Sequence, residues 1–415
     1  MRKIKRSWRS WILGVTAIAL TCFSPAVAQT TYRVTDLGAL HDGVFGCAMG
    51  LNNHGWTESM DEYLDASGNF VGRAVVNVSG LKIDLGTLGG RDSWIYWGGI
   101  NQQGEAVGEA ETSVLDPDGE DFCGFGTGLT CRPFLWRNGD MKPLPTLGGN
   151  NGLASAINNR GQITGKAQTT VTDSGCPPYQ VAPPVLWERG KVQQLPTVEG
   201  DPDGYALGIN ELGQVVGGTG TCSGDSHAVL WENRAAIELP NLGNASYNEA
   251  LAINNQGQIV GLVSSADGST FYAALWQNGA VRNLGTLPGD FAALATGIND
   301  KGQVVGSTLD SSFNWAHGFI WENGVMTDLN RLFPADSNLY ATMANKLNSR
   351  GQISGMATVL SGPDAGEIHA FLATPVNASI ASSVAAVATT HPKFTLPANV
   401  REQLLRRLGL DRLAR

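Results

Sequence analysis

Three short patterns of apolar and polar residues recur along the chain, always in the same order. The first is Ile-Asn-x-x-Gly-Gln followed by two apolar residues and Gly, as in INDKGQVVG at residues 298–306. Close copies stand at 100–108, 157–165, 209–217, 253–261 and 347–355, and a weaker copy, LNNHGWTES, stands at 51–59. Short apolar runs bounded by Gly and Asn are typical of β-strands joined by tight turns. The chain therefore predicts many short strands.

The other two patterns supply further strands. One is typified by DLGTLGG at 84–90, and the other ends in Leu-Trp, as in HAVLW at 227–231. In the Ile-Asn-x-x-Gly-Gln pattern, Asn favours the start of a type I turn, and Gly three positions later accepts a left-handed conformation. Asn-Gly pairs after Leu-Trp, such as Asn278-Gly279, predict a second hairpin. Each repeat is expected to form four antiparallel strands, A to D.

The spacing of the turn asparagines, which varies between 44 and 57 residues, predicts the ring architecture. A period of ~40–50 residues built from short strands is the signature of a β-propeller blade. The chain opens with a D-type strand at 32–40, and its repeats finish on a C-type strand at 369–373. We therefore predict an all-β, seven-bladed propeller with 3+1 closure, in which the N-terminal strand completes the last blade. In the first unit, LDASGNFVG at 64–72 competes with 51–59 as the A–B turn, so the blade count stays open.

Repeated side chains are expected to serve the fold. We expect His227, His317 and His369, which share one strand position, to be structural rather than catalytic. A large ring repeated at one position of strand C suits packing between adjacent blades, and the rings are Trp136, Trp187, Trp231, Trp276 and Trp321.

The triplet His369-Ala370-Phe371, with variants at 227–229 and 317–319, is followed by the linked patterns described above. In this combination the chain resembles the HAF-repeat family of bacterial extracellular proteins over about residues 32–374. The resemblance implies an exported bacterial repeat protein with a propeller-like fold, and it brings no catalytic motif. Asn77 and Ala373 depart from it at the Trp position.

The two ends differ from the repeats. Residues 1–28 combine a basic start, an apolar run and Ala26-Val27-Ala28, which predicts a cleaved secretory signal peptide. We therefore expect a secreted protein, periplasmic or extracellular, with its propeller at 29–374. An Ala/Ser/Thr-rich linker at 375–398 leads to a basic amphipathic helix at 399–415, which could touch an anionic membrane surface or dock on the acidic propeller.

Charge excludes one class of partner. The formal net charge is −9, and removal of residues 1–28 makes the remaining chain more acidic. An acidic body without a basic stripe repels phosphate backbones, so we expect no nucleic acid partner. Glycine at 53 positions and only 16% charged residues agree with many turns and strands. We expect a monomer.

The variable B–C loops are the expected seat of function, because binding residues concentrate in loops held by a rigid scaffold. Cys123, Cys131, Cys176 and Cys222 lie in these loops, and Cys47 lies in a D–A loop. In an exported protein we expect the pairs Cys123–Cys131 and Cys176–Cys222, with Cys47 left over.

Aromatic residues break the repeat in its second unit. Four residues before the turn asparagine the units carry Ala, but this one carries Trp97, with Trp94 and Tyr96 beside it. Together with Trp315 in loop 307–316, these rings are candidate ligand-binding residues for a carbohydrate face. The favoured alternative is packing beneath the long loop 109–131.

Acidic residues suggest two further sites. Asp116, Asp118 and Asp121 place oxygen ligands around a Gly turn, which suits calcium, although a solvated turn is the favoured alternative. No other cofactor is indicated. Enzyme motifs such as G-x-S-x-G, H-E-x-x-H and the phosphate loop are absent, so no catalytic residue is assigned. Loop acids could still converge at the channel mouth as glycosidase carboxylates, and the candidates are Asp92, Asp121, Asp201, Glu249 and Asp290.

From these observations we expect a non-catalytic binding or scaffold module that recognises a glycan or surface protein through its B–C and D–A loops. The alternative is a polysaccharide-active propeller enzyme, a hydrolase or lyase, that uses loop carboxylates at the channel mouth.

Overall fold

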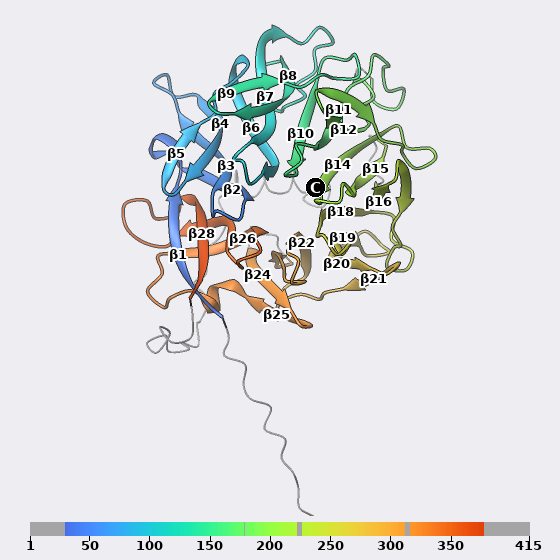
Figure 1. The fold of residues 1–415 in the computed structure, drawn as a ribbon. Coiled ribbons are helices and arrows are strands. Elements are labelled where there is room, and N and C mark those ends of the chain that lie inside the picture. The colour runs from blue at the N-terminus through green and yellow to red at the C-terminus, as the bar shows by residue number, and fades with distance from the viewer. Residues whose placement is uncertain (1–29, 178, 222–225, 312–315, 377–415) are drawn as a thin grey trace, which may run out of the picture.

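The computed structural model describes residues 30–177, 179–221, 226–311 and 316–376. In this part the chain forms an all-β, propeller-like fold, in which sheets surround a common centre (Figure 1). Two short 3-10 helices are present, η1 (Leu40–Asp42) and η2 (Leu329–Leu332). The predicted signal peptide and C-terminal helix lie outside the described residues, as does nearly all of the linker.

Five sheets contain four consecutive antiparallel strands each. The first of them is formed by β6 (Gly89–Ile100), β7 (Ala106–Leu115), β8 (Leu129–Arg137) and β9 (Asp140–Pro143). Next come β10 (Gly152–Ile157), β11 (Ile163–Ala167), β12 (Pro184–Glu188) and β13 (Lys191–Gln194). The third contains β14 (Asp203–Ile209), β15 (Val215–Gly220), β16 (Ser226–Glu232) and β17 (Ala235–Glu238). The fourth contains β18 (Asn248–Ile253), β19 (Ile259–Ser264), β20 (Phe271–Gln277) and β21 (Ala280–Asn283). The fifth contains β22 (Ala292–Ile298), β23 (Val304–Leu309), β24 (Ala316–Glu322) and β25 (Val325–Asp328).

The remaining sheet has eight strands and joins the two ends of the repeat region. One half contains β2 (Phe45–Leu51), β3 (Thr57–Leu64), β4 (Phe70–Val78) and β5 (Leu81–Asp84). The other half contains β26 (Leu339–Leu347), β27 (Ile353–Val359), β28 (Ile368–Val376) and β1 (Thr31–Gly38). A single parallel pair, Phe45 with Ile368, connects the halves. Strand β1 pairs antiparallel with β28, from Thr31 with Val376 to Gly38 with Ala370, so the pairing expected between the chain's first and last repeat strands is present.

The turn asparagines form a closed ring of hydrogen bonds. In every unit the Asn Oδ1 accepts from the backbone N–H groups two and four residues later, as the turn motif predicts. Each Nδ2 also donates to the backbone carbonyl of the next unit's Asn, at 2.9–3.4 Å. The donors, in order, are Asn52, Asn101, Asn158, Asn210, Asn254, Asn299 and Asn348, and the last donates back to Asn52.

The ring also settles the irregular first unit. Asn52 makes the same contacts as the other six asparagines, so residues 51–59 are the A–B turn of that unit. Residues 64–72 instead contain the turn between β3 and β4, where the Gly68 N–H donates to the Asp65 carbonyl.

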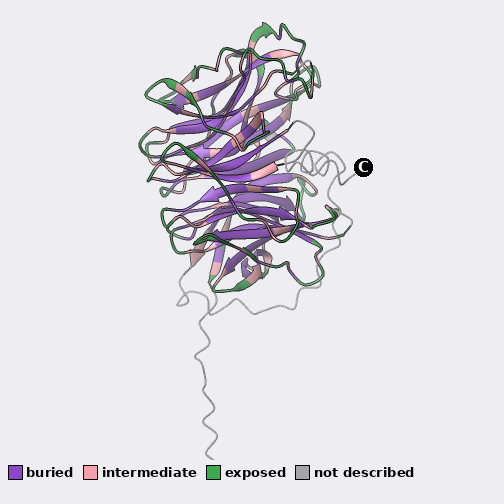
Figure 2. Ribbon diagram, turned by 90° about the vertical axis from the view of Figure 1, so that its right-hand side faces the viewer, coloured by how far each residue is buried: buried purple, intermediate pink, exposed green. Residues whose placement is uncertain are grey.

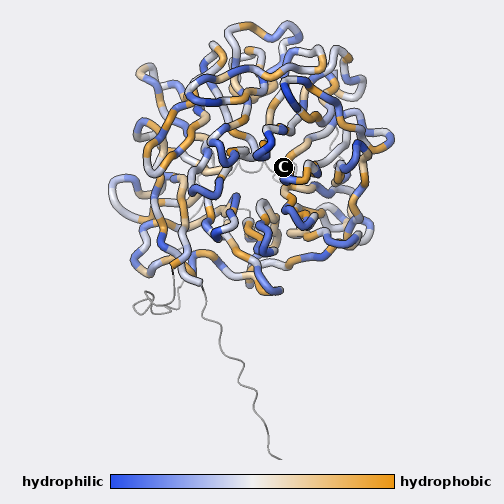
Figure 3. The backbone as a smooth tube through the Cα atoms, in the orientation of Figure 1, coloured by the Kyte–Doolittle hydropathy of each residue, from blue (hydrophilic) through white to orange (hydrophobic). Residues whose placement is uncertain are grey.

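The core lies between sheets, as Figure 2 shows by the buried strands within the disc. Figure 3 shows hydrophilic and hydrophobic positions interleaved around the whole ring. The strand-C tryptophans are buried as expected, and Trp187, Trp231 and Trp276 each donate from the indole N–H to a proline carbonyl at 2.6–2.7 Å. These bonds satisfy the one polar group of each ring, which allows burial at little cost.

Candidate functional site

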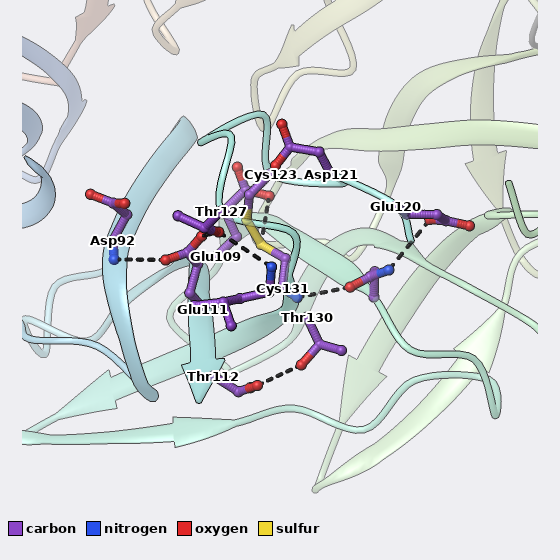
Figure 4. Close-up of a disulfide and its surroundings, with 12 residues drawn as sticks. Asp92, Glu109, Glu111, Thr112, Glu120, Asp121, Cys123, Thr127, Thr130 and Cys131 are labelled. Carbon is purple, nitrogen blue, oxygen red and sulfur yellow. Dashed lines mark hydrogen bonds between the residues drawn. A yellow bond between two sulfur atoms is a disulfide. The ribbon is translucent and has the colours of Figure 1, made fainter. Parts of the chain in front are cut away.

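The long loop between β7 and β8 is held by the expected disulfide between Cys123 and Cys131 (Figure 4). Cys176 is also disulfide-bonded, whereas Cys222 lies outside the described residues. Cys47 is buried, and its Sγ donates to the Met49 sulfur at 3.4 Å. Glu109 lies near the Cys123 and Cys131 sulfur atoms, but these are bonded to each other and offer no thiolate to a metal.

The predicted calcium residues accept hydrogen bonds from protein groups. Asp116 accepts from the backbone of Asp118 and from the Asn151 side chain, and Asp118 accepts from Asn150 and Gln180 side chains at 2.8 Å. Asp121 accepts from the Gly126 N–H. Among the described residues the three carboxylates do not form a group with converging ligand atoms. Calcium binding here stays a prediction.

The three aromatic residues of β6 have different surroundings. Trp94 packs on Phe125 of the long loop, with ring centroids 5.3 Å apart. This contact agrees with the alternative expectation that the rings pack beneath loop 109–131. Trp97 is only 7% exposed and belongs to the buried cluster that also contains Met49, Leu207 and Leu251. Trp315 lies outside the described residues. Of the described candidates, Tyr96 stacks on Tyr205 and so joins a group of polar and aromatic side chains.

The strand register corrects the alignment of the second unit. Trp94 pairs with Glu109 as Leu153 pairs with Lys166, which places Ile95, not Trp97, at the alanine position of the other units. Tyr96 and Trp97 lie in a bulge before Gly99 that is two residues longer than the bulge in β10. Counting back from the turn asparagine fails here because the bulge changes the register.

Tyr96 belongs to a group of side chains around the propeller axis, which we call the axial cluster: Tyr96, Lys166, Tyr205, Tyr247 and Glu249. The Tyr96 and Tyr205 rings are stacked, with centroids 6.1 Å apart and planes 9° apart. The Lys166 Nζ donates to the Tyr205 hydroxyl at 2.8 Å, and it lies 4.7 Å from the centroid of the Phe122 ring. The cluster thus joins β6, β11, β14 and the start of β18 on the side of the B–C loops.

Glu249 is the acid of the axial cluster. The Tyr247 hydroxyl donates to its Oε2 at 3.2 Å. Burial raises the pKa of Glu249 to about 7, although the Tyr247 hydrogen bond opposes this shift. The residue as a whole is half-buried. Burial, followed by the charge of Glu249, raises the Tyr247 pKa well above its usual value, so the phenol stays a hydrogen-bond donor.

A second titrating group lies on β14, two residues from Tyr205. Asp203 accepts from the Ala182 N–H at 2.7 Å. Its pKa is raised, first by burial and also by its hydrogen bond to the neighbouring Asp173, while the charge of Lys166 opposes the shift. The axial region therefore combines one carboxyl that holds its proton near neutral pH with a second carboxyl pair beside a lysine.

The other candidate loop acids support local structure. Asp92, 1% exposed, accepts from the Gly72 N–H and pairs with Arg91. Asp201 and Asp290 bind the ring Nδ1 atoms of His227 and His317, each at 2.8 Å. His369 makes the corresponding bond to Asp36 of β1 at 2.9 Å. Of the five loop acids proposed from the sequence, the structure brings only Glu249 to the axial cluster.

Comparison with known proteins gives matches among solved structures only. No protein-family model and no curated protein matches the chain. An acylaminoacyl peptidase from Pyrococcus horikoshii is 13% identical, with a TM-score of 0.46 over 75% of this chain and 50% of the peptidase. A prolyl endopeptidase structure is 10% identical, with a TM-score of 0.47 over 84% of this chain and 51% of that chain. The propeller domain of the Trilobed protease from Pyrococcus furiosus is 9% identical, with a TM-score of 0.37 over 69% of this chain and 96% of that domain.

These neighbours contradict our expectation of a non-catalytic module, because they are mainly enzymes that hydrolyse bonds, a puromycin hydrolase included. The alternative expectation, an enzyme, agrees with them better. The chain spans about half the length of the acylaminoacyl peptidase and prolyl endopeptidase chains. At these identities the likeness extends to the fold, so the choice of chemistry rests on the residues of this chain.

Sequence reasoning missed Tyr205, Tyr247, Lys166 and Asp203, although one signal was available. Five residues before the turn asparagine, four units carry Cys47, Leu153, Leu294 and Met343, whereas two others carry Tyr205 and Glu249. Polar or aromatic residues at a position that is otherwise apolar or sulfur-containing mark the inner wall of the channel. The bulge in β6 hides the corresponding residue of the second unit, Trp94.

Proposed function

We propose that the protein is a hydrolase that cleaves glycosidic bonds at the axial cluster, with Glu249 as the proton donor. The observation that carries this proposal is the position of one largely desolvated carboxyl beside stacked tyrosine rings at the propeller axis. A sugar ring presents apolar C–H faces to aromatic rings and hydroxyl groups to polar side chains. Tyr96 and Tyr205 suit the first need, and Lys166 suits the second.

Hydrolysis of a glycosidic bond needs one carboxylic acid and one carboxylate. In our proposal Glu249 gives its proton to the leaving oxygen as the bond from the anomeric carbon to that oxygen breaks. A water oxygen bonds to the same carbon, and Asp203 takes the water proton. A carboxyl with a pKa of about 7 is matched to proton donation near neutral pH, because about half of it stays protonated there. The raised pKa of Asp203 makes its carboxylate a stronger base than an exposed one.

The test is product release from cell-wall and plant polysaccharides, measured as new reducing ends. We expect Glu249→Gln to lower the rate at least ~100-fold while binding to the same glycan persists, because general acid catalysis contributes factors of this size. Glu238→Gln, the same change on the exposed outer strand β17, should keep the wild-type rate. Absence of products from every glycan, or wild-type turnover by Glu249→Gln, would refute the proposal.

We further propose that the chain is an exported, monomeric member of the HAF-repeat family whose partner is a glycan, and that its propeller has seven blades. The closed ring of asparagines and the pairing of β1 with β28 support seven units with 3+1 closure. The signal-like residues 1–28 support export. In the described part of the chain, no helix has the length and apolar character needed to cross a membrane. Mass spectrometry of the exported protein should find a new N-terminus at Gln29.

A further inference from the structure

One residue of the inner strands breaks the repeat at the end of the channel opposite the axial cluster. Two residues before the turn asparagine, Lys346 occupies a position that is small in every other unit. The small residues are Gly50, Gly99, Ala156, Gly208, Ala252 and Gly297. At this level neighbouring sheets approach closely: a Cβ on Gly99 would lie 2.7 Å from the Ala156 Cα. Small residues fit this position because the inner strands lie close together, so the long cationic side chain of Lys346 is an exception that needs an explanation.

Lys346 lines an open cavity of about 190 Å³ at the A–B turns. The residue directly before each turn asparagine is Ile or Leu, and these residues, such as Ile100, Ile209 and Leu347, form an apolar rim. Leu207 and Leu251, which pack with Trp97 in the buried cluster, form part of the wall. Lys346 is the one charged residue among the lining side chains of this cavity.

Among the described residues, no carboxylate forms an ion pair with Lys346. The acid that acts on it electrostatically is Glu58 on β3, whose Oε1 accepts from the Val107 N–H at 3.2 Å. Burial raises the pKa of Glu58 to about 8 and lowers the pKa of Lys346 to about 8, and the attraction between the two groups opposes both shifts. A desolvated ammonium without a carboxylate at ion-pair distance is costly, and a bound anion would offset that cost.

We propose that this cavity binds a short-chain carboxylate, with its head group on the Lys346 ammonium and its hydrocarbon part against the Ile/Leu rim. The charge accounts for the head group. The apolar rim accounts for the tail, since a bare inorganic anion would leave it in contact with water. No residue of the axial cluster lines this cavity, so the site is distinct from the proposed hydrolytic site.

Calorimetric titration of the full chain with acetate, propionate and butyrate tests the proposal. Each added methylene should tighten binding by about threefold to fourfold, which is the effect of burying one CH₂ group. Lys346→Met, which keeps the length of the side chain but removes its charge, should weaken butyrate binding at least ~10-fold, since hydrogen bonds to charged groups have this strength. Lys346→Arg should retain binding. Lys301→Met, at an exposed lysine in a neighbouring A–B turn, should bind butyrate within about twofold of wild type, because an exposed charge contributes little.

Three results would overturn the proposal. The first is no saturable butyrate binding to a folded wild-type chain. The second is equal binding by Lys346→Met. The third is displacement of butyrate by chloride or phosphate at equal concentration, which would identify an inorganic anion site without a role for the apolar rim. Butanol, which has the tail without the charge, should not compete.

Discussion

The asparagine ring offers the most direct test of how the repeat holds the propeller together. Asn254 is 4% exposed, and its side chain makes four hydrogen bonds. Its Oδ1 accepts from the Gln256 and Gln258 N–H groups at 3.0 and 2.9 Å. Its Nδ2 donates to the Asn299 carbonyl at 3.0 Å and to the Gln258 side chain at 2.7 Å. Asn254→Ala therefore removes a turn and a contact between units together.

At about 1 kcal/mol net for each hydrogen bond, Asn254→Ala should lower the free energy of unfolding by roughly 4 kcal/mol. That is a large effect for one substitution. Asn254→Asp keeps both Oδ1 bonds but turns a carboxylate toward two oxygen acceptors. The pKa of the new carboxyl should therefore be higher in the folded than in the unfolded chain. This variant should lose stability as the pH rises from the unfolded to the folded pKa.

The measurement is guanidinium unfolding followed by tryptophan fluorescence at pH 7. The matched control is Asn278→Gly, at an exposed hairpin asparagine with a φ of 53°, where Gly keeps the left-handed backbone. This control should lose no more than about 0.5 kcal/mol, as is usual for exposed positions. A loss below about 1 kcal/mol for Asn254→Ala would refute the reasoning, since it would mean that water replaces the ring contact at no cost.

Two further predictions concern closure and pH. Deletion of residues 29–41 removes β1, its pairing with β28 and the Asp36–His369 hydrogen bond, so we expect cooperative unfolding to be lost. A deletion variant with an unchanged unfolding transition would contradict the 3+1 closure. The pKa of Glu249 is raised on folding, so its contribution to stability falls as the pH rises from about 4.5 to about 7. Relative to wild type, Glu249→Gln should gain on the order of 2 kcal/mol between pH 5 and pH 8, and parallel stability curves for the two proteins would contradict that assignment.

Regular features could be predicted from the sequence because they follow local rules. The Asn and Gly positions specify the A–B hairpins, and strand-C tryptophans such as Trp187 are buried as their repetition suggests. The contact of each turn asparagine with the next unit was not predictable from turn chemistry, which concerns one chain segment. The register of β6 was missed because a bulge of unknown length separates Ile95 from the turn.

The candidate site was predictable only in part. Tyr96 and Glu249 were candidates, but their meeting with Tyr205 and Lys166 depends on the way four sheets converge at the axis. Asp201 and Asp290 look equally available in the sequence, yet each is bound to a histidine. Lys346 shows the opposite case, because comparison of the units with one another already marks it as the exception at its position.

The asparagine ring has a direction but no starting point. Every member donates forward and accepts from behind, so the amide dipoles circulate around the axis and largely cancel. The first and last described strands, β1 and β28, pair with each other in the outer part of the disc, whereas the ring of asparagines has no first or last member (Figure 1). The long B–C loops contain none of the ring asparagines, so substitutions in these loops leave the hydrogen bonds of the ring in place. A protein built in this way can diversify one face of the disc while the opposite face keeps the circle closed.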